Sequence, residues 1–288
     1  MKASARAFGA ATIVNAIATG KGAAFGIGLK TEATVELNDS GKIVGNIIDS
    51  PKEDTKLIEI CARIVLEKFH LKLGAKIETE SCIPIAAGLK SSSTAANAVV
   101  LATIEAARQE NNKIKLSDHE ILDLAVDAAL EAKVTITGAY DDASASYFGG
   151  AVVTDNMQRK ILNRWEIDTD LAVVIFVPEQ KIYTATVDVK RTKLIAEEVE
   201  IAWKEALNKN IYTAMKLNGL LYSAAFQQNP EIAFSAVEAG AISAGLSGKG
   251  PAVVALTRDD PEEITDAWSE FEGITIVTKV NNTKAGIV

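Results

Sequence analysis

The 288-residue chain has few cysteines, no basic excess and no long apolar run, and each shortage excludes a class of protein. Only Cys61 and Cys82 are present, without a CxxC pair or a histidine cluster, so a zinc site is not expected. A disulfide between them is one alternative, but two buried thiols in a reducing compartment are favoured. The formal charge of −8 argues against general binding to nucleic acid or to an anionic membrane, because no basic field would attract the chain.

No segment approaches the roughly 20 apolar residues that are needed to span a bilayer. Residues 1–22 are too broken by Arg6, Asn15 and glycines to form a secretory signal. We therefore expect a cytoplasmic protein. The length suggests two domains of about 150 residues each, and a change in composition near residues 156–169 places the expected domains at 1–160 and 161–288.

Strands and helices are mixed along the chain without strict alternation, which favours an α+β fold. Period-two alternation predicts strands over 23–37 and 41–49, and "NDSG" between them predicts a hairpin turn. Apolar residues at helical spacing predict helices at about 55–69, 93–110 and 117–133. The glycine-bounded stretch "TGAYDDASASYFGGAVV" is expected to be a polar loop that leads into a strand.

Four consecutive hydroxyl side chains, Ser91 to Thr94, stand where the second of these helices begins. They could cap the helix, because its first N–H groups have no partner within the helix, but one such residue is enough for capping. Gly88 allows backbone N–H groups to turn inward, and Lys90 adds a positive charge. A helix N-terminus of this kind is also a good binding site for phosphate. Capping alone and phosphate binding both remain open on spacing alone.

The common nucleotide motifs do not explain this cluster. A Walker A loop needs a glycine, four residues and then Gly-Lys-Ser/Thr, and none of the glycine-lysine segments follows that pattern. No GxGxxG follows a predicted strand, so a Rossmann dinucleotide site is not expected either.

The run "PIAAGLKSSS" at residues 84–93 resembles the ATP-binding motif of the GHMP kinases, Pro-x-x-x-Gly-Leu-Gly-Ser-Ser-Ala/Ser, with Lys90 at the second glycine. The Gly-Leu-Lys-Ser-Ser form is similar to the archaeal type of shikimate kinase. "NAIATGKGAAFGIGL" and "GLSGKGPAVVAL" resemble that family too, in the expected order. The resemblance implies a two-domain GHMP kinase fold, with an N-terminal half like ribosomal protein S5 domain 2 and a ferredoxin-like C-terminal half. ATP and the acceptor would meet in the cleft between the halves.

The resemblance also implies roles for individual residues. Asp142 falls at the catalytic aspartate when counted back from Gly149–Gly150, and Glu131 precedes it by the eleven residues expected of the Mg²⁺-binding glutamate. Ser92 would be the other Mg²⁺ ligand, and Asp141 would contact substrate hydroxyls. The expected ATP-binding residues are Pro84, Ala86, Ala87, Gly88, Leu89, Lys90, Ser91, Ser92, Ser93, Thr94 and Gly248.

The expected activity is transfer of the γ-phosphate of ATP to the 3-hydroxyl of shikimate, with Mg²⁺. Shikimate carries a carboxylate, and Arg191 with Thr184 is the expected site for it. Two alternatives stay open: another small-molecule kinase of the family, for homoserine or mevalonate, and a non-catalytic nucleotide-binding protein on the same fold. The expected partner is therefore a small molecule, and the oligomeric state is open, with a homodimer as one option.

Overall fold

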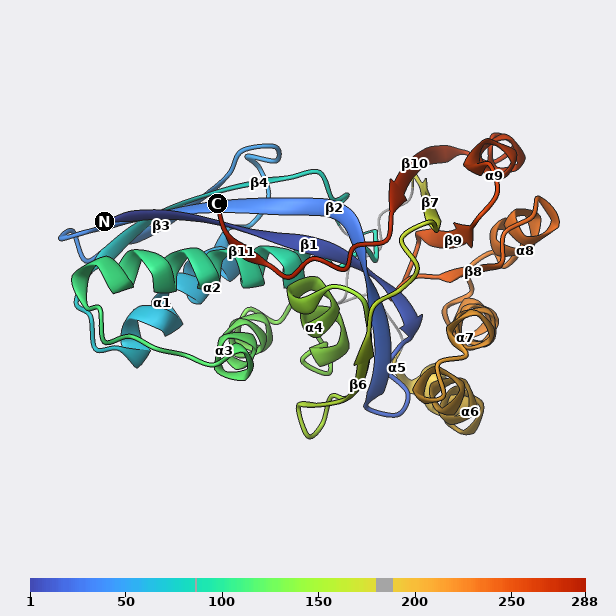
Figure 1. The fold of residues 1–288 in the computed structure, drawn as a ribbon, viewed down its shortest axis with the longest axis horizontal. Helices are drawn as coiled ribbons and strands as arrows, with labels where there is room; N and C mark the ends of the chain where they lie inside the picture. The colour runs from blue at the N-terminus through green and yellow to red at the C-terminus, as the bar shows by residue number, and fades with distance from the viewer. Residues whose placement is uncertain (86, 180–188) are drawn as a thin grey trace.

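The computed structural model describes residues 1–85, 87–179 and 189–288, and its first half contains a large sheet covered by helices. The elements of this half, in chain order, are β1 (Lys2–Val14), β2 (Lys21–Asn38), β3 (Ile43–Ile47), α1 (Lys56–Lys68), β4 (Gly74–Ser81), α2 (Ser91–Glu110), α3 (Asp118–Glu131), α4 (Tyr140–Phe148), β5 (Ala151–Asp155) and β6 (Lys160–Trp165). The strand order is β11-β1-β2-β4-β3, in which β11 (Gly286–Ile287) comes from the end of the chain, and β5 joins through β2 and pairs with β6. Helices α1 to α4 lie together on one face of the sheet (Figure 1).

The second half has its own antiparallel sheet of order β10-β7-β9-β8. Its elements are β7 (Ala172–Pro178), α5 (Val189–Thr192), the 3-10 helix η2 (Lys193–Ile195), α6 (Ala196–Leu207), α7 (Ile211–Phe226), α8 (Glu231–Glu238), β8 (Ser243–Leu246), β9 (Val253–Thr257), α9 (Pro261–Trp268) and β10 (Gly273–Lys279). The chain then returns to the first sheet, where β11 (Gly286–Ile287) pairs with β1 and brings the C-terminus beside the N-terminal strand (Figure 1). The mixed α+β character is confirmed.

The three predicted helices are present with small shifts of their ends. They correspond to α1, α2 and α3, and α3 begins with a capping box in which Ser117 and Glu120 satisfy each other's backbone N–H groups. The prediction that "TGAYDDASASYFGGAVV" forms a polar loop is wrong, since residues 140–148 within it form α4. Small side chains such as Ala143, Ser144 and Ala145 are buried in this helix, so its polar composition reflects close packing rather than exposure.

The predicted hairpin at "NDSG" is also wrong. Strand β3 does not pair back onto β2 but runs parallel to β4, with Ile43 opposite Ala75 and Ile47 opposite Thr79. Strand β4 takes the place beside β2 instead. Sequence alternation identified both strands correctly, but it carries no information about which strand is the neighbour.

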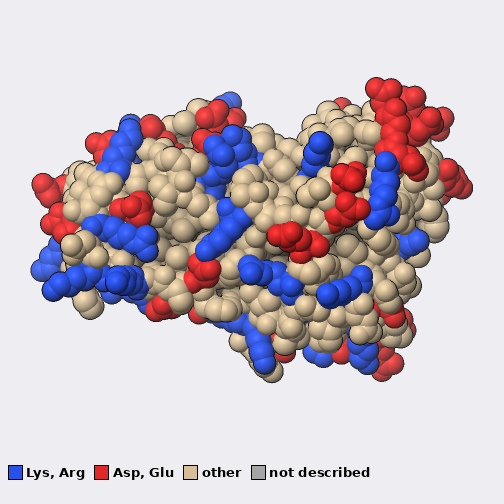
Figure 2. Space-filling model, viewed as in Figure 1, with Lys and Arg blue, Asp and Glu red and all other residues tan. Residues whose placement is uncertain are grey.

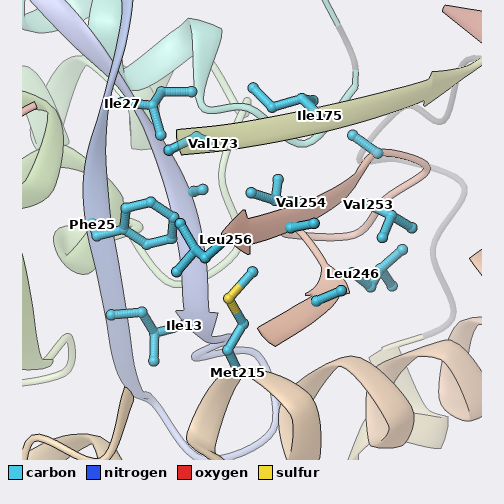
Figure 3. Close-up of a cluster of buried hydrophobic side chains, with 14 of the residues drawn as sticks. Ile13, Phe25, Ile27, Val173, Ile175, Met215, Leu246, Val253, Val254 and Leu256 are labelled. Carbon is cyan, nitrogen blue, oxygen red and sulfur yellow. The ribbon is translucent and has the colours of Figure 1, made fainter. Parts of the chain in front are cut away.

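Strands β1 and β2 are long enough to belong to two hydrophobic cores. Their outer parts, including Ala5 and Val35, pack with helices α1 to α4. Their inner parts, including Ile13 and Phe25, pack against the second sheet and α7. Figure 3 shows Ile13 and Phe25 facing Leu256 of β9 and Met215 of α7. The shared strands thus hold the two halves together by apolar burial, which stabilises folded chains by about 25 cal/mol per Å².

Charges of both signs are interspersed over the face seen in Figure 2, with acidic side chains gathered over α9. Cys61 is buried as expected, whereas Cys82 is exposed, and both are free thiols. Over the described ranges, no helix has both the length and the apolar character that crossing a membrane requires.

Candidate active site

A cleft of about 480 Å³ lies where the two halves meet. Its walls come from the end of β1, the segment between β3 and α1, the loop before α2, the segment from the end of α3 to the start of α4, and the loop between β8 and β9. The three sequence regions that carry the resemblance all contribute to it.

The start of α2 forms part of the wall. Lys90 takes a left-handed conformation with φ of 65°, and the helix begins directly after it at Ser91. The side chain of Lys90, the N-cap residue, makes no capping hydrogen bond. Ser91, Ser92 and Ser93 line the cleft, and the first-turn N–H groups of the helix, which have no partner within it, lie at the same wall. Thr94 differs: it is fully buried, with its hydroxyl 2.9 Å from the Lys90 carbonyl oxygen.

The loop before α2 is hydrogen-bonded to the loop between β8 and β9. Ser247 Oγ donates to the Gly88 carbonyl oxygen at 2.8 Å, and the Ala252 N–H donates to Ala87 at 3.0 Å. Gly88 has φ of 86°, and a Cβ there would collide with the Ser247 carbonyl oxygen. Position 88 therefore requires glycine for two reasons, its backbone conformation and the close approach of the second loop.

The end of β1 fixes the same loop from another side. The Gly248 N–H donates to Thr12 Oγ1 at 2.8 Å, and Asn15 Nδ2 donates to the Gly248 carbonyl oxygen at 2.8 Å. The Asn15 N–H in turn donates to Oδ1 of the buried Asn218 on α7 at 2.8 Å. These bonds are buried, so the loop is held firmly against the cleft.

Asp142 faces the start of α2. Its Oδ1 lies 3.0 Å from Lys90 Nζ, and the two side chains are only 13% and 9% exposed. Although this ion pair is close, Oδ1 is buried and accepts no hydrogen bond from the described residues. The carboxylate therefore has capacity to accept a bond from a bound hydroxyl group.

Asp141, the neighbour of Asp142 in α4, is almost completely buried. Its Oδ1 accepts a hydrogen bond from Asn156 Nδ2 at 2.7 Å, and its carboxyl group fills the space beside Gly22. Burial and, after it, the negative charge of Asp142 raise the pKa of Asp141 to about 7, against the opposing effects of Lys90 and of the hydrogen bond from Asn156. Two adjacent aspartates thus have different environments: one is enclosed by protein, and the other faces Lys90.

The structure brings together about half of the residues predicted for the site. Those that line the cleft are Gly88, Lys90, Ser91, Ser92, Ser93, Asp141, Asp142 and Gly248. Four others belong to the surrounding structure and are not in the wall: Pro84, Ala87, Leu89 and Thr94. Ala86 and Thr184 lie outside the described residues.

Two predicted residues lie elsewhere. Glu131, at the last position of α3, is 53% exposed and its carboxylate pairs with the Arg63 guanidinium, with Arg63 Nη2 to Glu131 Oε2 at 2.6 Å. Arg191 is exposed and donates to the Ala224 carbonyl oxygen at 3.4 Å. Neither belongs to the described wall of the cleft.

Some residues of the wall were not predicted. Lys249 lies in the wall between Gly248 and Gly250. It belongs to the motif "GLSGKGPA", in which only Gly248 was predicted to bind ATP. The far end of the cleft combines apolar side chains with the carboxylates of Asp49 and Asp54, between β3 and α1. No local pattern marks this apolar surface, because its side chains come from separate segments: Ile47, Leu57, Ile58, Val134 and Ile136.

Comparison with known proteins shows the family of the chain. Residues 56–150 match the model of the GHMP kinases N-terminal domain, and residues 203–273 match that of the GHMP kinases C-terminal domain. The shikimate kinase of Methanothermobacter thermautotrophicus is 47% identical over 98% of this chain and 96% of its own length. That of Methanosarcina mazei is 48% identical over 97% of this chain and 94% of its own. The chain belongs to the GHMP kinase family.

Solved structures show the same fold at low identity. Mevalonate kinase of Methanococcus jannaschii has a TM-score of 0.75 at 18% identity, covering 98% of each chain. Homoserine kinase of Cytophaga hutchinsonii has a TM-score of 0.73 at 16% identity, covering 100% of this chain and 97% of its own. The two-domain GHMP kinase fold and the resemblance to archaeal shikimate kinases are confirmed.

Proposed function

We propose that the chain is a shikimate kinase, which transfers the γ-phosphate of ATP to the 3-hydroxyl of shikimate and releases shikimate 3-phosphate and ADP. Relatives of nearly the same length, at 43–48% identity, carry the name shikimate kinase, and this supports the choice of acceptor. The cleft supports the chemistry, because it combines a helix N-terminus, a lysine and a buried carboxylate.

The phosphates of ATP would bind at the start of α2. The first-turn N–H groups and the hydroxyls of Ser91, Ser92 and Ser93 offer hydrogen bonds to phosphate oxygens, and the helix dipole favours negative charge there. Lys90 adds a cation at the same point. In phosphoryl transfer such groups stabilise the charge on the transferring group, and little covalent chemistry is left to the protein.

Asp142 carries the proposal, because its buried Oδ1 lies 3.0 Å from the Lys90 ammonium and accepts no hydrogen bond from any other described residue. It would accept the proton of the acceptor hydroxyl. The hydroxyl oxygen then forms a bond to the γ-phosphorus, while the bond from that phosphorus to the β–γ bridging oxygen breaks and ADP leaves. Lys90 lies close enough to contact both the carboxylate and the transferring phosphate.

The residues of the cleft fit Mg²⁺ held mainly by ATP. Magnesium keeps several waters and takes one or two protein oxygens together with the phosphates, and the hydroxyl of Ser92, which lines the cleft, is a suitable oxygen donor. When bound, the ion would neutralise charge on the β- and γ-phosphates. Glu131 as a ligand remains a prediction from the motif spacing, and its ion pair with Arg63 argues against it.

The adenosine would occupy the apolar end of the cleft. Leu57, Ile58 and Ile136 provide surfaces for a flat ring, and the carboxylates of Asp49 and Asp54 lie at the same end. Negative side chains disfavour phosphates there, so the nucleotide has one favourable orientation, with its phosphates at the Lys90 end. A cytoplasmic location and a homodimer remain predictions.

An ADP-release assay with shikimate, homoserine and mevalonate as acceptors tests the proposal. We expect ADP release with shikimate only, and a product whose phosphorus resonance is coupled to the proton at carbon 3. Turnover of homoserine or mevalonate in place of shikimate would contradict the substrate assignment. Binding of ATP without turnover of any acceptor would favour the non-catalytic alternative.

A further inference from the structure

The proposed acceptor is an anion, and its carboxylate needs a cation in the site. Arg191 was predicted to be that cation. Arg191 is exposed and bonded to the Ala224 carbonyl oxygen, outside the described wall of the cleft. Within the described wall, the cationic side chains are Lys90, Lys133 and Lys249. Lys90 belongs to the start of α2, and Lys133 follows α3 beside the apolar end, so these two lysines serve other parts of the cleft.

Lys249 lies in the wall that the β8–β9 loop forms with the end of β1. Its neighbour Gly248 is bonded on both sides, through its N–H to Thr12 Oγ1 and through its carbonyl oxygen to Asn15 Nδ2, each at 2.8 Å. The wall continues with Ala16 and Ile17. The lysine is thus presented by a loop with little freedom, as a residue that positions a substrate should be.

The Lys249 ammonium lies in the electrostatic field of the reacting groups. Burial and, after it, the charge of Lys90 lower the pKa of Lys249 to about 8, and Asp142 opposes both effects. An ammonium that is partly withdrawn from water gains more from an incoming carboxylate than a solvated one does. Lys90 is also close, since a Cβ on Gly248 would lie 3.0 Å from Lys90 Nζ.

We propose that Lys249 binds the carboxylate of the acceptor and makes the site selective for hydroxy acids over neutral alcohols. The inference rests on the proposed function and assigns a residue to its substrate. With Lys249 on the carboxylate and Lys90 on the phosphate, two lysines bind two anionic groups, one on each reactant, and the acceptor is oriented with a hydroxyl near Asp142.

The test uses Lys249→Gln with two acceptors, shikimate and its methyl ester, which keeps the hydroxyls and lacks the charge. In the unsubstituted protein we expect kcat/KM for shikimate to exceed that for the ester by about 30-fold or more, as for a desolvated charge pair. Lys249→Gln should raise the KM for shikimate by about 30-fold and remove the preference, while the KM for ATP changes less than about threefold. Lys249→Arg should recover part of the preference, and Lys216→Gln, on the exposed face of α7, is the matched control.

The outcomes separate the inference from the proposed function. A Lys249→Gln protein that binds ATP normally and still prefers shikimate over the ester overturns the inference alone. An increase in the KM for ATP with an equal loss for both acceptors would also overturn it, because the lysine would then bind phosphate. If the unsubstituted protein does not phosphorylate shikimate, the proposed function fails and this inference fails with it. If Lys249→Gln does not fold, Lys249→Arg and the methyl ester still decide. A full preference of Lys249→Arg for shikimate over the ester, with an unchanged KM for shikimate, supports a cation at position 249. No preference for shikimate in either the unsubstituted protein or Lys249→Arg excludes it.

Discussion

The two ends of the cleft differ in charge, polarity and origin. One end combines Lys90 from the start of α2, Lys249 from the loop between β8 and β9, and Asp142 from the first turn of α4. The other end is built from apolar side chains between β3 and α1 and after α3, with acidic residues among them. The charged end is suited to groups that carry or develop charge, and the apolar end to a ring that does not. A kinase needs both, and their separation fixes the direction in which a nucleotide lies.

The strongest test of this division is removal of the carboxylate at the charged end. Asp142→Asn keeps the shape and loses the proton acceptor, so we expect kcat to fall by about 10² to 10⁴-fold with little change in the KM for ATP. Steady-state kinetics with shikimate measures this. Asp266→Asn, an exposed residue of α9, is the control, and an unchanged kcat in Asp142→Asn would contradict the assigned role.

Lys90 should be the next most sensitive residue. Lys90→Gln removes the cation beside the helix N-terminus, and we expect kcat to fall by about 100-fold, comparable to loss of one preorganised donor. The KM for ATP should rise as well, since the lysine would contact phosphate in the ground state too. Single-turnover kinetics separates the two effects, and a change in the KM for shikimate alone would show that Lys90 binds the acceptor instead.

Asp141 tests how far the two adjacent carboxylates differ. Its pKa is raised from 3.8 to about 7, so the folded state holds the proton more tightly than the unfolded state. This contribution to stability is fully present below pH 3.8 and is lost as the pH rises through about 7. Asp141→Asn removes the titration while keeping an acceptor for Asn156.

We therefore expect the stability of Asp141→Asn relative to the unsubstituted protein to be about 2 kcal/mol more favourable at pH 8 than at pH 5. Urea unfolding at both pH values measures this difference. A relative stability that does not change with pH would show that the buried carboxyl group titrates normally.

The apolar end should respond more weakly and in a different parameter. Leu57→Ala removes part of the surface for the base, and we expect the KM for ATP to rise about fivefold, equivalent to about 1 kcal/mol. The KM for shikimate should not change. Equal effects on both substrates would indicate that the two ends are not separate sites.

Glu131 should give the smallest effect. Since its carboxylate pairs with Arg63 outside the described wall of the cleft, Glu131→Gln should change kcat and the dependence on Mg²⁺ concentration by less than about twofold, as expected for an exposed ion pair. A large increase in the Mg²⁺ concentration required for activity would instead support the motif-based assignment.

The sequence predicted the elements better than their arrangement. Helical periodicity identified α1 and α3, because each has one apolar face against the first core, and it also indicated α2, whose middle is buried on all sides from Ala96 to Ile104. Helix α4 was missed, since small buried residues such as Ala143 and Ser144 lack the apolar signal that periodicity detects. The parallel pairing of β3 with β4 depends on contacts between distant segments, which a local turn signal does not contain.

The site shows the same limit. The hydroxyl run and Asp142 are recognisable from local patterns, and folding brings them to one cleft. Glu131 was selected by its distance along the chain from Asp142. That spacing contains no information about Arg63 of α1, with which the Glu131 carboxylate forms an ion pair. Lys249 and the apolar end become evident only when the loops and the segment after β3 are placed in space.

The central claim is that the phosphates bind at the start of α2, between Lys90 and Asp142. A crystal structure with shikimate and a non-hydrolysable ATP analogue tests it most directly. We expect the γ-phosphate to accept hydrogen bonds from the first-turn N–H groups of α2, with the shikimate 3-hydroxyl on Asp142 and the adenine beside Leu57. A triphosphate bound at the apolar end, or outside the cleft, would contradict the account.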